Sequence, residues 1–206
     1  MATFVLIRHA TYDRIGQRIV GRMEGICLNE RGRAQAAELG KRLAALPIRS
    51  IRSSPLQRTR ETACAIARSL SLQVELDDDL NEIDYGEWTG MEVRELDTLP
   101  EWLRFNALRG TAQIPGGENM VQVAARAVGT MERLHHLEPE GWFALISHGD
   151  WIRAAVAHYT GVCLDRLRRF EIAPASVSIV RVEASGPRIL LLNSTGDLAH
   201  SATQIR

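Results

Sequence analysis

The stretch TFVLIRHA, residues 3–10, sets an apolar and partly β-branched run directly before an arginine and a histidine. A short continuous apolar run of this kind predicts a buried strand over residues 3–7. Arg8 and His9 would then lie at the carboxyl end of that strand. Whether they carry chemistry depends on what the rest of the chain brings to the same place.

Strands and helices alternate over most of the remaining sequence. This alternation predicts an α/β fold, a single-domain three-layer α/β/α sandwich with a mainly parallel central sheet over residues 1–206. The last two strands are expected to form a closing hairpin or pair. Further strands are predicted at residues 48–53, 72–76, 142–147, 176–182 and 188–192, and helices at 30–46, 55–70, within 91–108, at 121–135 and at 150–160.

The composition is that of an ordinary soluble domain. The 206 residues are 45% hydrophobic and 24% charged, with a formal net charge of zero, so no global field attracts nucleic acid or an acidic membrane. The three cysteines are widely spaced, which favours neither a disulfide framework nor a zinc site. No signal peptide or membrane span is recognisable, and we expect a cytoplasmic protein. The sequence does not specify an oligomeric state.

Three predicted strands end in residues suited to chemistry. The first ends in Arg8-His9, the second in Ser53-Ser54, and a later one in Ser147-His148-Gly149. Ligands of α/β folds bind beyond the carboxyl ends of parallel strands. We therefore expect these groups to meet at one edge of the sheet.

The helix after the second strand adds an arginine to this group. Ser54 and Pro55 are predicted to be its N-cap and first residue, with Gln57 completing a capping box. This places Arg58 in the first turn, where backbone N–H groups also favour anions. Arg60 is the alternative, although an offset of two residues puts it on another face.

Two arginines and two histidines at one site suit phosphoryl transfer. The reaction needs positive charge around the phosphoryl oxygens and a nucleophile in line with the leaving group. Arg8 and Arg58 supply permanent charge and forked donors. Either His9 or His148 could attack phosphorus through a neutral imidazole nitrogen, while the other donates a hydrogen bond.

The leaving group also needs a proton, which a carboxyl group with a raised pKa can deliver. The loop after the third predicted strand contains three acidic candidates: Glu82, Asp84 and Glu87. Composition alone does not choose among them.

Four ordered motifs resemble those of the histidine phosphatase (phosphoglycerate mutase-like) superfamily. The resemblance covers nearly the whole chain, and its specificity comes from the order and spacing of the motifs rather than from any one of them. The motifs are LIRHAT (residues 6–11), SSPLQRTRETA (53–63), LNEIDYGEWTG (80–90) and ISHG (146–149).

The resemblance implies a role for each candidate. His9 becomes the phosphorylated nucleophile, with Arg8, Arg58 and His148 around the phosphate and Glu82 as the proton donor. The implied mechanism has two steps, phosphorylation of His9 and hydrolysis of the phosphohistidine, and requires no metal or organic cofactor. The predicted substrate-binding residues are Arg8, Arg58, His148 and Gly149.

The segment after the first motif departs from the family pattern. Ala10 stands where the family usually has glycine, and residues 13–15 lack the asparagine that often contacts phosphate. Arg14, Arg18 and Arg22 follow. They either contact an acidic substrate or form a solvated face, and the sequence favours the second interpretation.

Three functions are compatible with these motifs: a phosphatase, a cofactor-dependent phosphoglycerate mutase, and a non-catalytic phosphate-binding module. A mutase needs a lid that excludes water. Only about 24 residues separate Gly90 from Pro115, which predicts a segment too short for such a lid. All five catalytic positions are present, which disfavours a binding module. We therefore expect a phosphatase acting on a small phosphorylated metabolite.

Overall fold

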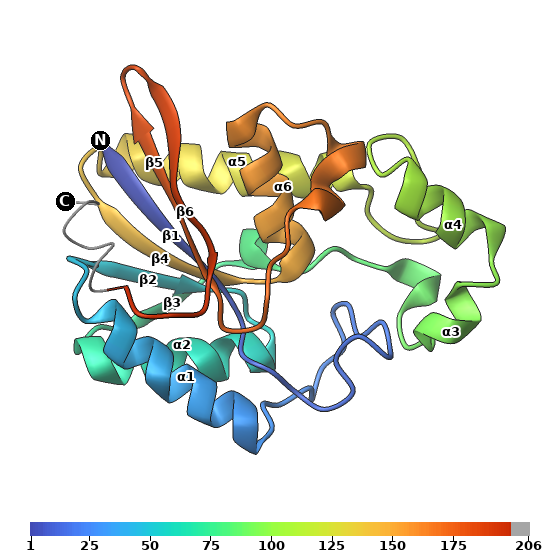
Figure 1. The fold of residues 1–206 in the computed structure, drawn as a ribbon, viewed down its shortest axis with the longest axis horizontal. Helices are drawn as coiled ribbons and strands as arrows, with labels where there is room; N and C mark the ends of the chain where they lie inside the picture. Colours follow the sequence, from blue (N-terminus) through green and yellow to red (C-terminus); the bar gives the residue numbers. More distant parts are fainter. Residues whose placement is uncertain (199–206) are drawn as a thin grey trace.

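The computed structural model describes residues 1–198 and contains one six-stranded sheet. The strand order is β3-β2-β4-β1-β5-β6. The first four strands are parallel, β5 runs antiparallel to β1, and β6 runs antiparallel to β5 (Figure 1). This confirms the predicted mainly parallel sheet and the closing hairpin. The strands are β1 (Ala2–Arg8), β2 (Ser50–Ser53), β3 (Val74–Leu76), β4 (Trp142–Ser147), β5 (Val177–Glu183) and β6 (Gly186–Ser194).

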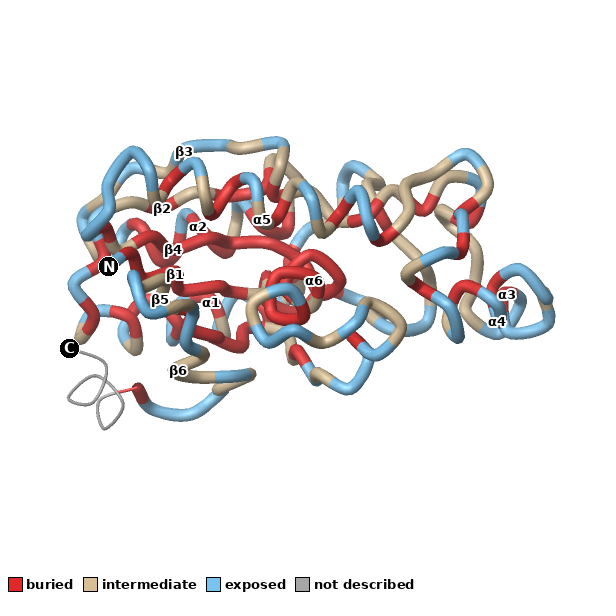
Figure 2. The backbone as a smooth tube through the Cα atoms, turned by 90° about the horizontal axis from the view of Figure 1, so that it is seen from above, coloured by how far each residue is buried: buried red, intermediate tan, exposed pale blue. Residues whose placement is uncertain are grey.

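Helices cover both faces of this sheet, as predicted for a three-layer sandwich. One layer holds α1 (Glu30–Leu43) and α2 (Gln57–Leu70), and the other holds α5 (Met120–Leu137) and α6 (Gly149–Thr160). Two short helices, α3 (Val93–Leu96) and α4 (Pro100–Ala107), lie beyond the sheet at one end of the molecule in both views (Figures 1 and 2).

The apolar run of the first strand explains the two layers. Successive side chains of a strand point to opposite faces. Phe4 and Leu6 accordingly pack into the core under α5 and α6, whereas Val5 and Ile7 pack into the core under α1 and α2. All four side chains are fully buried, and β1 and β4 form the buried centre of Figure 2.

The predicted start of α2 was wrong. The helix begins at Gln57 rather than Pro55, and Leu56 occupies the N-cap position without a side-chain cap. The Ser54 hydroxyl instead donates to Asn81 Oδ1 at 2.9 Å and lies 2.9 Å from His148 Nε2. The same hydroxyl accepts from the Leu56 backbone N–H at 3.3 Å, so Ser54 has a local contact but stands before the helix rather than at its N-cap.

The register of the central strands brings together the candidate site residues that follow β1, β2 and β4. Arg8 pairs with Ser147, and Ser53 pairs with Ile146, so β1, β4 and β2 end at the same edge. The residues that follow each strand emerge side by side there, as predicted. Among the described residues, no helix has the length and apolarity needed to cross a membrane.

Candidate active site

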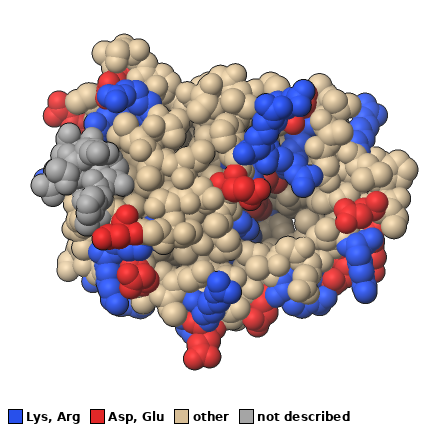
Figure 3. Space-filling view, in the orientation of Figure 1, with Lys and Arg blue, Asp and Glu red and all other residues tan. Residues whose placement is uncertain are grey.

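A cavity of about 560 Å³ opens at the carboxyl edge of the parallel strands. Its lining includes Arg8 and His9 from the end of β1, Arg58 from the first turn of α2, Glu82 from the following loop and Gly149 from the start of α6. The space-filling view shows a hollow on this face with basic and acidic side chains around it (Figure 3). Residues from four separate parts of the sequence thus share one site.

His9 has one ring nitrogen occupied and one available. Its Nδ1 lies 2.8 Å from the Ala10 carbonyl oxygen, which can only accept, so Nδ1 carries the proton. The lone pair therefore resides on Nε2. Burial lowers the pKa of His9 well below its usual range, and the nearby Arg58 and Arg8 lower it further. The ring is thus a neutral imidazole with an unprotonated Nε2.

His148 is neutral as well, but its two nitrogens are both engaged. Arg58 Nη2 can only donate and lies 3.2 Å from His148 Nδ1, which leaves the proton on Nε2 to be donated to Ser54 Oγ at 2.9 Å. Burial and the Arg58 charge lower the pKa of His148 well below its usual range. The rings of His9 and His148 are 5.2 Å apart, centroid to centroid.

Arg8 and Arg58 each donate to a backbone carbonyl, and each also has N–H groups that are not used in these hydrogen bonds. Arg58 is 1% exposed and donates from Nη2 to the Gly21 carbonyl at 2.7 Å. Arg8 donates from Nη1 to the Ile172 carbonyl at 2.6 Å. Within residues 1–198, the buried Nε and Nη1 of Arg58 and Nε of Arg8 have no hydrogen-bond partner. Buried charged donors without partners are costly, so these atoms are suited to receive an anion.

Gly149 contributes space beside this anion-binding group. A Cβ atom at that position would lie 3.2 Å from Arg153 Nη1 and 3.6 Å from Arg8 Cζ. The glycine thus lets the start of α6 approach the arginines closely.

Among the three acidic candidates of the loop, Glu82 alone lines the cavity. Arg22 donates to its backbone carbonyl at 2.9 Å, which ties down the loop at this residue. Burial raises the pKa of the Glu82 carboxyl, and the carboxylate of Asp150 raises it further. The carboxylate of Asp84 instead accepts from the Gly86 backbone at 2.9 Å, and Glu87 is exposed.

Residues 91–114, here termed the wall segment, form one side of the cavity. Val93, Asp97, Trp102, Asn106 and Arg109 of this segment contribute to the lining. The segment was predicted to be too short for a lid, and it folds into α3 and α4 and reaches the cavity. It forms a wall, and the hollow still opens to the surface (Figure 3).

An aromatic cluster anchors the wall segment to residues 80–90, the loop that carries Glu82 and is here termed the glutamate loop. Trp102 packs against Trp88 with ring centroids 5.4 Å apart and edge-to-face geometry, and Phe105 packs against Trp88 at 5.6 Å. Tyr85 lies 6.4 Å from each of the rings of Trp102 and Phe105. Edge-to-face pairs add stabilisation beyond the buried area.

The arginines after the first motif have separate roles. Arg14 is largely exposed and pairs with Glu92 at 2.7 Å, and Arg22 pairs with Glu118 at 2.8 Å. Arg18 donates to the Gly90 carbonyl at 2.6 Å and, unlike the other two, lines the cavity. The expectation of a solvated face thus describes Arg14 best.

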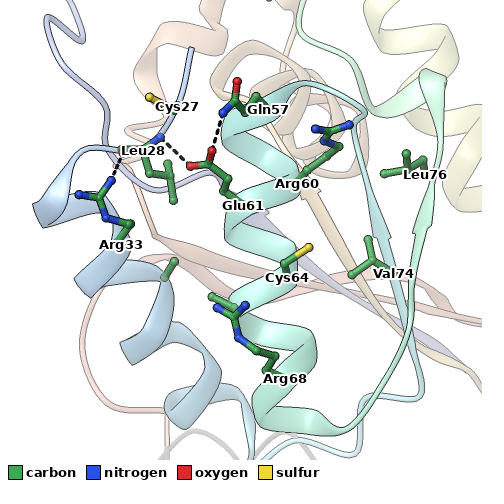
Figure 4. A pocket seen from close by; sticks show the side chains of 12 residues that line it. Cys27, Leu28, Arg33, Gln57, Arg60, Glu61, Cys64, Arg68, Val74 and Leu76 are labelled. Atoms are coloured by element: carbon green, nitrogen blue, oxygen red, sulfur yellow. Dashed lines mark hydrogen bonds between the residues drawn. The ribbon is translucent and has the colours of Figure 1, made fainter. Parts of the chain in front are cut away.

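Arg60, the alternative to Arg58, belongs to a different cavity of about 650 Å³ between α1, α2 and β3. Figure 4 shows this cavity, where Arg60, Cys64 and Arg68 follow one another at intervals of one turn along α2. The two-residue offset therefore separates the arginines as predicted.

Several lining residues had not been singled out from the sequence. Asp150 follows the ISHG motif directly, and this position was the one available signal. Arg109 and Arg168 had no signal, because nothing local links them to the motifs. These lining residues include Tyr12, Arg109, Asp150, Arg153, Arg168 and Glu171. Within the described part of the chain, no group of three or more His, Cys, Asp and Glu residues could hold a metal ion.

Comparison with known proteins gives one consistent family. The profile of the histidine phosphatase superfamily (branch 1) matches residues 4–195. Phosphoserine phosphatase 1 of Hydrogenobacter thermophilus is 34% identical over 200 residues, covering 95% of this chain and 93% of that protein. A probable phosphoglycerate mutase of Cronobacter sakazakii is 32% identical over 209 residues, covering 97% and 95%.

Solved structures share the same fold. A mycobacterial glucosyl-3-phosphoglycerate phosphatase superposes with a TM-score of 0.84 at 25% identity, covering 93% of this chain and 98% of that one. A phosphoserine phosphatase variant from Entamoeba histolytica, in complex with phosphoserine, has a TM-score of 0.86 at 22% identity, covering 95% and 98%.

Proposed function

The chain belongs to the histidine phosphatase superfamily (branch 1) and is a phosphatase-type enzyme, and from this premise we propose that it hydrolyses small phosphomonoesters through a phosphohistidine on His9. The observation that carries this proposal is the set of unpartnered guanidinium donors on Arg8 and Arg58, beside the unprotonated Nε2 of His9. A phosphate group satisfies those donors and presents its phosphorus to that nitrogen.

In the first step, His9 Nε2 forms a bond to phosphorus while the bond to the leaving oxygen breaks. The Glu82 carboxyl gives its proton to that oxygen and becomes a carboxylate. The imidazole keeps its proton on Nδ1 and gains positive charge, which the Ala10 carbonyl stabilises through the existing hydrogen bond. Arg8 and Arg58 hold the equatorial phosphoryl oxygens.

In the second step, water attacks phosphorus and transfers a proton to the Glu82 carboxylate. The bond between phosphorus and Nε2 breaks, which releases inorganic phosphate and restores neutral His9. Glu82 is again protonated and ready for another cycle. The raised pKa of Glu82 suits a group that alternates between acid and base. No metal enters either step, because the two arginines supply the positive charge.

Phosphoserine is the first substrate to test. The relative from Hydrogenobacter thermophilus is a phosphoserine phosphatase. The outer part of the cavity offers charges of both signs, from Arg168, Glu171 and Asp97, which suits a zwitterionic leaving group. Phosphosugars, phosphoglycerate derivatives and α-ribazole phosphate are the other small phosphomonoesters to compare.

The alternative is a cofactor-dependent phosphoglycerate mutase, because a probable mutase is 32% identical to this chain. A mutase retains the phosphohistidine until a second hydroxyl attacks, so water must be excluded. The wall segment borders the cavity without closing it, which favours hydrolysis.

The deciding experiment compares the two reactions on one preparation. Phosphate release is measured over the panel of phosphomonoesters, without added metal and with a chelator. Interconversion of 2- and 3-phosphoglycerate is measured in parallel, with and without bisphosphoglycerate. We expect chelator-resistant phosphate release that exceeds interconversion. Primer-dependent interconversion much faster than release would establish the mutase instead.

A further inference from the structure

Asp150 is a buried acid for which the proposed mechanism has no role. Its side chain is 6% exposed and accepts three hydrogen bonds from charged or phenolic donors. Tyr85 Oη donates to Oδ2 at 2.7 Å, Arg109 Nη1 donates to the same oxygen at 2.9 Å, and Arg153 Nη1 lies 3.1 Å from Oδ1. Such a cluster is costly to bury, so its position calls for an explanation.

The three partners come from three different elements. Tyr85 belongs to the glutamate loop, three residues after Glu82. Arg109 belongs to the wall segment and lies two residues after the end of α4. Arg153 is one turn further along α6. Asp150 Oδ2 is thus the atom at which the wall segment and the glutamate loop are joined to the helix that follows His148.

Arg109 is itself held firmly in the wall segment. Its guanidinium lies over the Phe105 ring, 4.6 Å from the centroid, and its Nη2 donates to Asn106 Oδ1 at 3.0 Å. The side chain is 7% exposed. A displacement of the wall would therefore break its ion pair with Asp150.

We propose that Asp150 is a positioning residue for the proposed hydrolysis, joining the wall segment to the glutamate loop and keeping a permanent negative charge beside Glu82. This inference rests on the proposed function, in which Glu82 must hold a proton before the leaving group departs. The negative charge disfavours ionisation of Glu82, so the Glu82 carboxyl keeps its proton until the leaving group departs.

The charges around Glu82 oppose one another. Arg58 and Arg8 favour its ionised form, whereas burial and the Asp150 carboxylate favour the protonated form, and the result is a raised pKa. Asp150 stays ionised because Arg109, Arg153 and the Tyr85 hydroxyl lower its pKa. The charged and titratable groups that face Glu82 are Arg8, Tyr12, Arg58, Tyr85, Arg109 and Asp150.

The test is the alkaline limb of kcat/KM for an alkyl phosphate, which reports the acid in the free enzyme. In Asp150→Asn the negative charge is lost, so Glu82 ionises more readily and the limb should move to lower pH by roughly 1 unit. In Arg109→Gln a positive charge is lost, and the limb should move to higher pH. Opposite shifts are not expected from general damage to the fold.

Tyr85→Phe is the matched control. Its hydroxyl is neutral because its pKa is raised well above 10.0, so replacing it removes a hydrogen bond without changing a charge. We expect kcat/KM to fall because the glutamate loop is held less firmly, while the alkaline limb of its pH profile stays at the wild-type pH. If the alkaline limb of kcat/KM stays at the wild-type pH in both Asp150→Asn and Arg109→Gln, the proposal is overturned and Asp150 has a structural role only.

A second measurement separates this inference from the proposed function. The Glu82 carboxyl carbon is titrated by NMR, with Glu82→Gln used to assign its signal. A lower Glu82 pKa in Asp150→Asn supports the inference without any turnover. If that variant does not fold, the same titration of Arg109→Gln must show a higher pKa, and an unchanged value overturns the inference. Phosphatase failure with a shifted Glu82 pKa would count against the proposed function alone.

Discussion

The hydrogen bond from His9 Nδ1 to the Ala10 carbonyl leaves Nε2 as the unprotonated nitrogen, which is the attacking atom in the proposed mechanism. Without it, either nitrogen could carry the proton. The burial and positive surroundings that lower the pKa of His9 keep the ring neutral at physiological pH. His148 is equally neutral, but Arg58 and Ser54 occupy its nitrogens. This difference in hydrogen bonding distinguishes nucleophile from partner.

His9→Ala should abolish turnover, by more than about 10³-fold, because the covalent step has no other nitrogen available. Acid-labile phosphate incorporation into the protein should disappear with it. The control is His158→Ala, since His158 is exposed in the last turn of α6 and should retain activity within about twofold. Phosphate incorporation that persists in His9→Ala would assign the nucleophile elsewhere.

Glu82→Gln should discriminate between leaving groups. An alkyl alcohol leaves only with a proton, so alkyl phosphates should slow by about 10²–10⁴-fold, whereas nitrophenyl phosphate should slow much less. Steady-state rates on both substrates measure the difference. Glu87→Gln is the matched control, because Glu87 is an exposed acid of the same loop. Equal losses on the two substrates would contradict a role in proton donation.

At the scale of elements, the glutamate loop depends on a close approach of two backbone segments. Gly86 has a φ of +47°, and a Cβ atom there would collide with the Pro115 carbonyl and with Gly116 and Gly117. The same carbonyl accepts a hydrogen bond from the Glu87 backbone at 2.9 Å. Glycine is therefore required both by conformation and by space.

Gly86→Ala should lower the free energy of unfolding by at least about 2 kcal/mol, through left-handed strain and overpacking. Urea denaturation measures the change. Gly129→Ala is the control, since Gly129 lies within α5 and a Cβ atom there meets nothing within 4 Å. That variant should gain roughly 0.5–1 kcal/mol. Equal effects of the two changes would refute the close-approach argument.

At the scale of the whole molecule, the site couples ligand binding to stability. Arg58 is buried, and two of its donor atoms have no hydrogen-bond partner among the described residues. Inorganic phosphate that binds only the folded protein must stabilise it. The effect requires the intact fold, because α2, β1 and α6 each supply part of the site.

Inorganic phosphate at ten times its Kd should stabilise the protein by about 1.4 kcal/mol, which raises Tm by roughly 3–6 °C for a domain of this size. Differential scanning calorimetry measures the shift, with sodium chloride at equal ionic strength as the salt control. Arg58→Met should lose the specific part of the shift, which separates binding from the general effect of phosphate on stability. An undiminished shift in that variant would place the anion elsewhere.

The sequence by itself determined the sheet, its layers and the edge at which Arg8, His9, Arg58 and His148 meet. It could do so because strand burial, helix periodicity and strand-end motifs are local patterns, and parallel strands bring their ends together. The predicted start of α2 was wrong: Ser54 accepts from the Leu56 N–H before the helix begins, and its hydroxyl also contacts Asn81 and His148, partners that are distant in sequence and that no local pattern shows.

The family resemblance already pointed to Glu82 among the acids of its loop, whereas only the tertiary structure decided how the wall segment folds and where Asp150 belongs. The hydrogen bonds of Asp150 to Tyr85 and Arg109 span 65 and 41 residues of sequence, and no local pattern encodes either pairing. The aromatic contacts that anchor the wall segment likewise join Trp102 of α4 to Tyr85 and Trp88 of the loop that carries Glu82. Contacts of this kind arise from packing in three dimensions, and they shape the surroundings of the reacting groups.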